Sequence, residues 1–155
     1  MEIAIDKILC PVDFSPNSDH ALRYALAFAC AYGAELVLLH VVELPFMPSY
    51  TTAGVPDLSL PVERIREECQ DLMNHQVEAC KETHANTSGT VVVGTPFLEI
   101  VHTARDGKFD LIVVGTHGRS ALKQLLIGSV AEKVVRKAPC PVLTVKHPEH
   151  EFVMP

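Results

Sequence analysis

The amino-acid sequence predicts an α/β fold: a single domain built on an open, Rossmann-like parallel sheet of five strands, with helices on both faces. Short apolar runs alternate along the chain with longer segments whose apolar residues recur at helical spacing. Most of the apolar runs are continuous, without the polar residues that alternate along a half-exposed strand. Continuous apolar strands are typical of parallel sheets, because these are buried on both sides.

The beginning of the chain is predicted to form a strand, a helix and a second strand. The run KILCPV at 7–12 is short and apolar, as a buried strand would be. Ser15 can then cap a helix with Pro16 in its first turn, and helical spacing of apolar residues continues to Gly33. The run ELVLLHVV at 35–42 predicts the second strand.

A transmembrane helix is the alternative for residues 24–42, which are apolar over a sufficient length. Gly33 and Glu35 interrupt this segment at its middle, and a carboxylate at mid-bilayer is costly. The composition also changes there, from alanine-rich to rich in leucine and valine. We therefore expect a helix followed by a strand, with no membrane partner.

The middle of the chain is predicted to hold a long connection, a helix and a third strand. Residues 43–60 contain three prolines, a glycine and a cluster of Ser and Thr, which predicts a long, mobile connection. A second helix is expected to begin at Pro61. The run TVVVG at 90–94 predicts the third strand, and Thr95 with Pro96 repeats the cap-and-proline start for a third helix.

The last third of the chain is predicted to add two strands with a helix between them. The run FDLIVV at 109–114 predicts the fourth strand, and PVLTV at 141–145 predicts the fifth. The domain is thus expected to cover residues 1–146, followed by a loosely held tail at 147–155.

Composition and charge exclude several classes of protein. Apolar residues make up 48% of the chain, and its formal net charge of −6 argues against a general nucleic-acid binder, which needs a basic face. The five cysteines form no CxxC pair and no zinc-like spacing. Glu2 and Asp6 stand where a secretory signal would be positively charged. We expect a cytoplasmic protein with reduced thiols.

The histidines and cysteines predict no separate catalytic or metal centre. Only His147 and His150 lie close together, and they lack a third ligand at a suitable spacing. His40 lies in an apolar run and is predicted to be a packed core histidine. The order of residues shows no Cys–His or Ser–His–Asp arrangement, and no cysteine has a neighbouring basic residue that would clearly lower its pKa.

The segment GTHGRSALKQLLIGS at 115–129 has the composition of an anion-binding loop. Gly115 follows the fourth predicted strand and Gly118 can adopt a positive φ, so the backbone can turn sharply and bring N–H groups close to an anion. Gly128 and Ser129 begin a helix, whose first N–H groups have no partners within that helix. Ligands of parallel sheets bind at the carboxyl ends of strands, where this segment begins.

The side chains of this segment leave two interpretations open. Arg119 and His117 can donate charge-assisted hydrogen bonds to a phosphate, and Ser129 can donate its hydroxyl. Alternatively, Ser129 and Glu132 form a capping box that satisfies the helix end without a ligand. The segment is neither a Walker A loop, which needs a lysine after its last glycine, nor the GxGxxG pattern of dinucleotide-binding proteins.

The spacing Gly115-x2-Gly118-x9-Gly128-Ser129 resembles that of the universal stress protein family, in its ATP-binding branch. The segment VDFSPNS after the first strand and the final strand PVLTV agree with that family, and the likeness covers residues 7–146. The resemblance implies the strand order 3-2-1-4-5 and ATP as the ligand. It also implies a homodimer that forms through the C-terminal edge strand.

The resemblance further assigns the ligand site residue by residue. It places the Asp13 carboxylate near the ribose hydroxyls and the backbone of Val41 at the adenine edge. The alternative for Asp13 is an Asx turn with the backbone of Ser15. Phe14 departs from the small residue that the family often has at this place. The implied nucleotide-binding set is Pro11, Val12, Asp13, Val41, Gly115, His117, Gly118, Arg119, Gly128, Ser129 and Val130.

The implied function is that of an ATP-binding regulator of a stress response, whose protein partner the sequence does not name. Slow ATP hydrolysis is an alternative, with Mg²⁺ bridging the phosphates and Asp13, but no general base or water-positioning residue is evident. A dimeric adaptor that binds no nucleotide is the other alternative.

Overall fold

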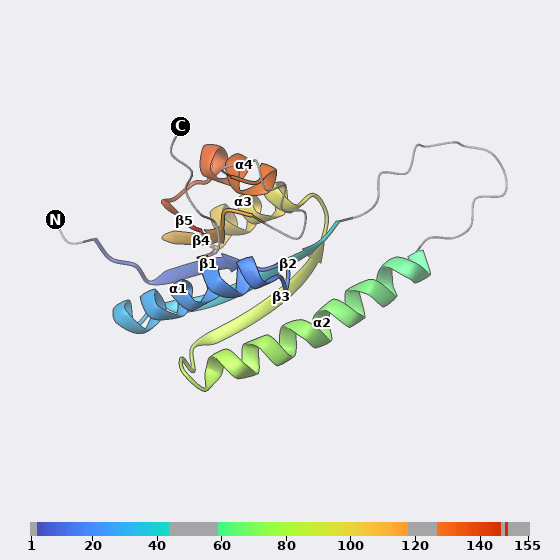
Figure 1. The fold of residues 1–155 in the computed structure, drawn as a ribbon, viewed down its shortest axis with the longest axis horizontal. Coiled ribbons are helices and arrows are strands. Elements are labelled where there is room, and N and C mark those ends of the chain that lie inside the picture. The colour runs from blue at the N-terminus through green and yellow to red at the C-terminus, as the bar shows by residue number, and fades with distance from the viewer. Residues whose placement is uncertain (1–2, 44–58, 118–126, 147, 149–155) are drawn as a thin grey trace.

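The computed structural model describes residues 3–43, 59–117, 127–146 and 148. Figure 1 shows a sheet with helices on both of its faces. The strands are β1 (Lys7–Pro11), β2 (Glu35–Val42), β3 (Thr87–Val93), β4 (Leu111–Gly115) and β5 (Val142–Val145). The helices are α1 (Pro16–Tyr32), α2 (Ser59–Lys81), α3 (Pro96–Asp106) and α4 (Ser129–Lys137).

The described strands form one open parallel sheet in the order β3-β2-β1-β4-β5. This arrangement confirms the predicted α/β class, the helices on both faces and the order 3-2-1-4-5. β1 lies at the centre, between β2 and β4. β4 is held beside β1 by Asp110, whose carboxylate accepts the backbone N–H groups of Asp6 and Lys7, both at 2.9 Å.

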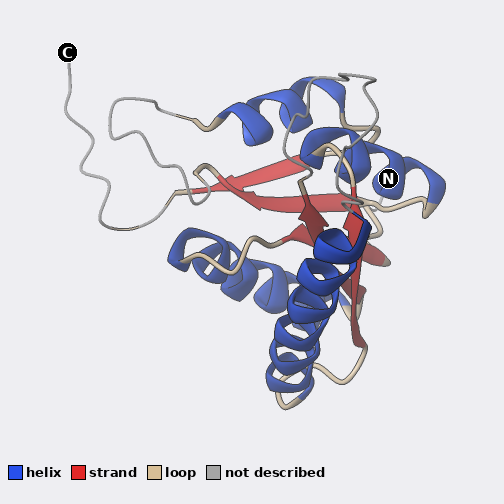
Figure 2. Ribbon diagram, turned by 90° about the vertical axis from the view of Figure 1, so that its right-hand side faces the viewer, coloured by secondary structure: helices blue, strands red, loops and turns tan. Residues whose placement is uncertain are grey.

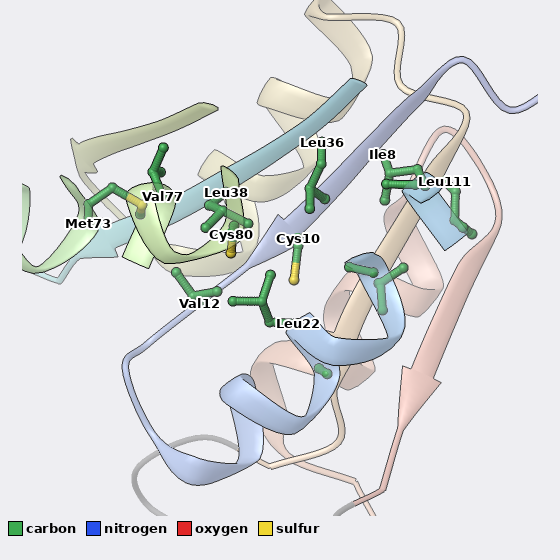
Figure 3. Packing of buried hydrophobic residues seen from close by; sticks show 14 of the residues in the cluster. Ile8, Cys10, Val12, Leu22, Leu36, Leu38, Met73, Val77, Cys80 and Leu111 are labelled. Atoms are coloured by element: carbon green, nitrogen blue, oxygen red, sulfur yellow. The ribbon is translucent and has the colours of Figure 1, made fainter. Parts of the chain in front are cut away.

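Two apolar clusters fill the space between the sheet and its helix layers, which Figure 2 shows on opposite sides of the strands. Successive side chains of a strand point to opposite faces, so Cys10 belongs to one cluster and Leu9 to the other. The first cluster joins the strands to α1 and α2, and Figure 3 shows Met73, Val77 and Cys80 of α2 in it. The second joins them to α3 and α4 through Ile100, Ala104, Ala131 and Val134.

The segment with a transmembrane alternative divides into a helix and a strand. Gly33 ends α1 in the left-handed conformation, with φ of 68°, and the chain continues directly into β2. A glycine adopts this conformation without the steric cost that a side chain would add. Within the described residues, no helix has the length and apolar character required to cross a membrane.

Three predicted starts differ from the structure by two residues or more. α2 begins at Ser59, two residues before Pro61, because a proline is tolerated in the first turn of a helix. β3 begins at Thr87 instead of 90, since the polar segment Thr87–Gly89 pairs with β2 at the edge of the sheet. β4 begins at Leu111 instead of 109 and extends to Gly115. Residues 44–58 of the predicted connection lie outside the described residues.

The two predicted cap-and-proline starts have different hydrogen bonding. The Ser15 hydroxyl oxygen accepts the N–H of Ser18 at 3.3 Å, whereas Thr95 occupies the same position before α3 without a side-chain capping bond. We expect Ser15→Ala to lower the free energy of unfolding by about 1 kcal/mol, because it removes this acceptor. Urea denaturation of both alanine variants tests this. Thr95→Ala is the matched control, and an equal loss in the two variants would contradict the assignment.

Candidate functional site

The carboxyl ends of β1 and β4 meet at the place where the strand order reverses. The next strand in sequence, β2, pairs with one side of β1, and β4 pairs with the other side of β1. Pro11 lies opposite Leu39 of β2, and Leu9 lies opposite Ile112 of β4. The segments that follow β1, β2 and β4 therefore leave the sheet at the same edge, where ligands of open α/β sheets bind.

The turn after β1 is built around the Asp13 carboxylate. The N–H of Ser15 donates to Asp13 Oδ1 at 3.0 Å, and the N–H of Asp13 donates to Ser18 Oγ at 3.3 Å. The Asx turn that was the alternative for Asp13 is thus confirmed. It uses one carboxylate oxygen and holds the half-buried Asp13 side chain at the start of α1.

Phe14 has a left-handed backbone, with φ of 60°, which is uncommon for a residue with a large side chain. Its ring lies against that of His40, with 4.6 Å between ring centroids. His40 Nδ1 is 2.8 Å from the carbonyl oxygen of Val12, and a carbonyl can only accept, so Nδ1 carries the proton. His40 is buried, which confirms it as a packed core histidine. The large Phe14 side chain, at the place where the family often has a small residue, therefore packs against His40 of β2.

Gly115 lies in close contact with the first turn of α1. A Cβ built on Gly115 would be 3.1 Å from the backbone oxygen of Asn17. Beyond it, the N–H of Thr116 donates to the carbonyl of Val145 at 2.9 Å, which extends the pairing of β4 with β5. The absence of a side chain at Gly115 thus lets the end of β4 approach the turn that carries Asp13.

Gly128 brings the start of α4 against the segment that follows β4. Its N–H donates to the Thr116 carbonyl, and a Cβ at Gly128 would be 3.1 Å from that oxygen and 3.6 Å from His117 Cα. The His117 side chain is buried, with Nδ1 3.0 Å from Thr116 Oγ1. The two ends of the predicted anion-binding loop are therefore in contact, next to the Asp13 turn.

The capping box that was the alternative for Ser129 is wrong. Gly128 is the N-cap residue of α4, with no side-chain capping bond, and Ser129 is the first residue of the helix. Ser129 is exposed, and Glu132 pairs with Arg136 one turn later, at 3.1 Å. Because glycine has no side-chain acceptor, the cap residue itself leaves the first N–H groups of α4 without a capping bond.

The structure brings most of the predicted nucleotide-binding residues to one edge of the sheet. Pro11 and Val12 are buried, and Val12 packs in the first core cluster. Val41 is half-buried at the end of β2, and the Val130 side chain is 36% exposed. Gly118 and Arg119 lie outside the described residues.

Sequence reasoning missed two contributors to this site. The Asn17 carbonyl contacts Gly115, and the Ser18 hydroxyl holds the N–H of Asp13. Ser and Asn after a strand are typical of turns and helix caps, so the segment SPNS carried a signal for Ser18. No pattern in the sequence indicated the approach of Asn17 to Gly115.

Comparison with known proteins identifies the family. The sequence model described as the universal stress protein family matches residues 4–146. The chain belongs to the universal stress protein family. Among similar proteins, a universal stress protein of Methanocaldococcus jannaschii is 34% identical over an alignment that covers 94% of this chain and 98% of that protein.

Solved structures of universal stress proteins share the fold. The universal stress protein UspA from Lactobacillus plantarum superposes with a TM-score of 0.78 at 25% identity, over 93% of this chain and 99% of that one. Another solved structure is a universal stress protein in complex with cAMP, with a TM-score of 0.61 at 27% identity, over 92% of this chain and 98% of that one. At least one structural relative of this universal stress protein therefore binds an adenine nucleotide.

Proposed function

We propose that this universal stress protein binds ATP at the carboxyl ends of β1 and β4, and that bound ATP regulates its interaction with a partner protein in a stress response. The contact of Gly128 with Thr116 and His117 carries the proposal. It brings the start of α4, which has no side-chain cap, to the edge of the sheet where Asp13 lies. The cAMP complex of a structural relative supports an adenine nucleotide as the ligand.

In this proposal, the turn after β1 binds the adenosine. Asp13 uses Oδ1 to hold the Ser15 N–H, so the carboxylate is fixed in orientation before a ligand arrives. A carboxylate accepts hydrogen bonds from two vicinal hydroxyls, as the ribose of ATP presents them. Pro11 and Val12 line the same side, and the backbone of Val41 contacts the adenine edge.

The loop between β4 and α4 binds the phosphates in this proposal. The first N–H groups of α4, at Ser129 and Val130, are donors at the positive end of the helix dipole. Gly115, His117 and Gly128 complete the described part of the site, and Gly128 does so by holding the start of α4 against Thr116. Gly118 and Arg119 are proposed to add an N–H group and a guanidinium to the phosphate contacts. Any Mg²⁺ would enter with the phosphates.

The same family membership leads us to propose a homodimer that forms through β5. This strand is an edge of the sheet, and its residues Val142, Leu143 and Thr144 are half-buried. An apolar edge strand is suited to pairing with another copy. Sedimentation equilibrium measures the oligomeric state directly, and a monomer at micromolar concentration would contradict this part of the proposal.

The Asp13→Asn variant tests the adenosine contacts. Asparagine keeps an Oδ1 acceptor for the Ser15 N–H, so the turn is preserved while the charge and one acceptor are lost. We expect the affinity for ATP, measured by isothermal titration calorimetry, to fall by about tenfold, because a hydrogen bond to a charged group contributes about 1.5–3 kcal/mol. Asp71→Asn, an exposed carboxylate on α2, is the matched control.

The same titration on the unaltered protein tests the proposed function itself. The protein is purified without added nucleotide, denatured, and the released small molecules are identified by chromatography before ATP is titrated. Released or tightly titrating ATP is the expected result. Absence of both a released ligand and a binding heat would overturn the proposal, and steady phosphate release would assign hydrolysis as well as binding.

A further inference from the structure

A cysteine and a histidine lie together at the opposite end of the sheet from the proposed nucleotide site. Cys30 is in the last turn of α1, and His84 lies in the turn between α2 and β3. Cys30 Sγ is 3.9 Å from His84 Nδ1 and 3.9 Å from the carbonyl oxygen of Thr83. Both turns are at the end where β2 and β3 begin, whereas Asp13 and Gly128 are at the end where the strands finish.

The hydrogen bond of the second ring nitrogen fixes which nitrogen of His84 is protonated. His84 Nε2 lies 2.7 Å from the carbonyl oxygen of Ala34. A carbonyl only accepts hydrogen bonds, so Nε2 carries the proton. In the neutral ring, Nδ1 then has a free electron pair directed at the Cys30 thiol. A nucleophile, a base beside it and a group that orients the base are the parts of an activated thiol.

Exposure separates Cys30 from the other cysteines of the chain. Cys30 is exposed, Cys69 and Cys140 are half-buried, and Cys10 and Cys80 are buried. Burial raises the pKa of the Cys10 thiol strongly and that of the Cys80 and Cys140 thiols as well, so these thiols are poor nucleophiles. Cys30 is therefore the thiol most open to small molecules in solution, and His84 lies beside it.

We propose that Cys30 and His84 form a site of reversible thiol–disulfide exchange with small-molecule disulfides, such as glutathione disulfide. His84 Nδ1 takes the proton of the Cys30 thiol, and the resulting thiolate attacks one sulfur of the disulfide. A new bond forms between Cys30 Sγ and that sulfur, while the old S–S bond breaks and its electron pair leaves with the other sulfur as a thiolate. A second small-molecule thiol reverses the reaction by attack on the mixed disulfide.

The modification would change the surface at the end of α1 and leave the nucleotide site in place. The Ala34 carbonyl accepts the His84 N–H, and the Thr83 carbonyl oxygen lies 3.9 Å from Cys30 Sγ, so backbone groups position this pair. The exchange site is therefore independent of the proposed ATP site, and each can be tested without the other.

The rate of disulfide exchange in the native full-length protein tests this proposal. Glutathione disulfide and the chromogenic probe dithiobis(nitrobenzoate) are each added in excess, and the modified cysteines are mapped by peptide mass spectrometry. We expect Cys30 to be modified first and Cys30→Ser to lose the fast reaction. His84→Gln retains an N–H donor for the Ala34 carbonyl but has no comparable base, and we expect it to slow the reaction by about tenfold. His75→Gln, an exposed histidine on α2, should have no effect.

Two results would overturn the proposal. One is a His84→Gln variant that is folded by circular dichroism and reacts within about twofold of the unaltered protein. The other is preferential modification of a cysteine other than Cys30. Should His84→Gln fail to fold, the Cys30 rate in the native protein is compared with that in urea. We expect Cys30 to react about fivefold faster in the native protein than in urea, and an equal or slower rate in the native protein would overturn the proposal.

Discussion

Replacing Gly128 with valine is expected to weaken ATP binding by at least about a hundredfold, or about 2.7 kcal/mol. The reason is steric: the added Cβ would lie 3.1 Å from the Thr116 carbonyl oxygen and 3.6 Å from His117 Cα, both of which are backbone atoms. Two further methyl groups must displace the start of α4 from the end of β4. The conformation of Gly128, with φ of −72° and ψ of 156°, is open to any residue, so backbone strain does not contribute.

Calorimetric titration of ATP into folded Gly128→Val measures this effect. Val135→Ala, an exposed position farther along α4, is the control and should bind as the unaltered protein does. We expect Gly118→Val to lose binding in the same way, because Gly118 is the second glycine of the proposed phosphate loop. Unchanged affinity in both glycine variants would falsify the phosphate site, even if nucleotide binds elsewhere.

Replacing Ile112 with alanine is expected to have the largest effect on stability, a loss of about 2–5 kcal/mol in the free energy of unfolding. Ile112 is fully buried in the second core cluster. It lies opposite Leu9 of β1 and Val142 of β5, so the side chain fills space between neighbours on both sides. Its removal loses apolar burial and leaves a cavity in the second core cluster.

Urea denaturation compares this variant with Val135→Ala, whose side chain is 48% exposed in the unaltered protein. The control should change the free energy of unfolding by less than about 0.5 kcal/mol. A loss below about 1 kcal/mol in Ile112→Ala would mean that the core around β4 is not packed as described.

Local patterns in the sequence were sufficient to predict the elements of the fold. Continuous apolar runs became buried strands, and Ser15 with Pro16 and Gly33 correctly marked the two ends of α1. The order of the strands depended on contacts between distant residues, which the apolar pattern does not contain. It was predicted through the likeness of the loop at 115–129 to a known family. Strand starts such as Thr87 were missed because polar edge residues carry no apolar signal.

The site was predictable where its chemistry is local. The Asx turn at Asp13 joins two residues that are two positions apart, and it was one of the interpretations that the sequence allowed. Ser129 and Glu132 have the spacing of a capping box, but the box does not form. The helix begins at Ser129, one residue earlier than a cap at Ser129 requires. The Cys30–His84 pair joins residues 54 positions apart, which meet where the last turn of α1 lies beside the turn that precedes β3.

The central position of β1 has a consequence for the order in which the chain can fold. β1, α1 and β2 follow one another in sequence, but β4, the other neighbour of β1, follows about a hundred residues later, as the Asp110 contacts with Asp6 and Lys7 show. During synthesis the N-terminal segments emerge first, so one edge of β1 has no partner until nearly three quarters of the chain is made. Closing that long loop is entropically costly, which makes pairing of β1 with β4 a late and slow step. A nascent chain halted before β4 would expose an unpaired edge of the buried central strand to other proteins in the cell.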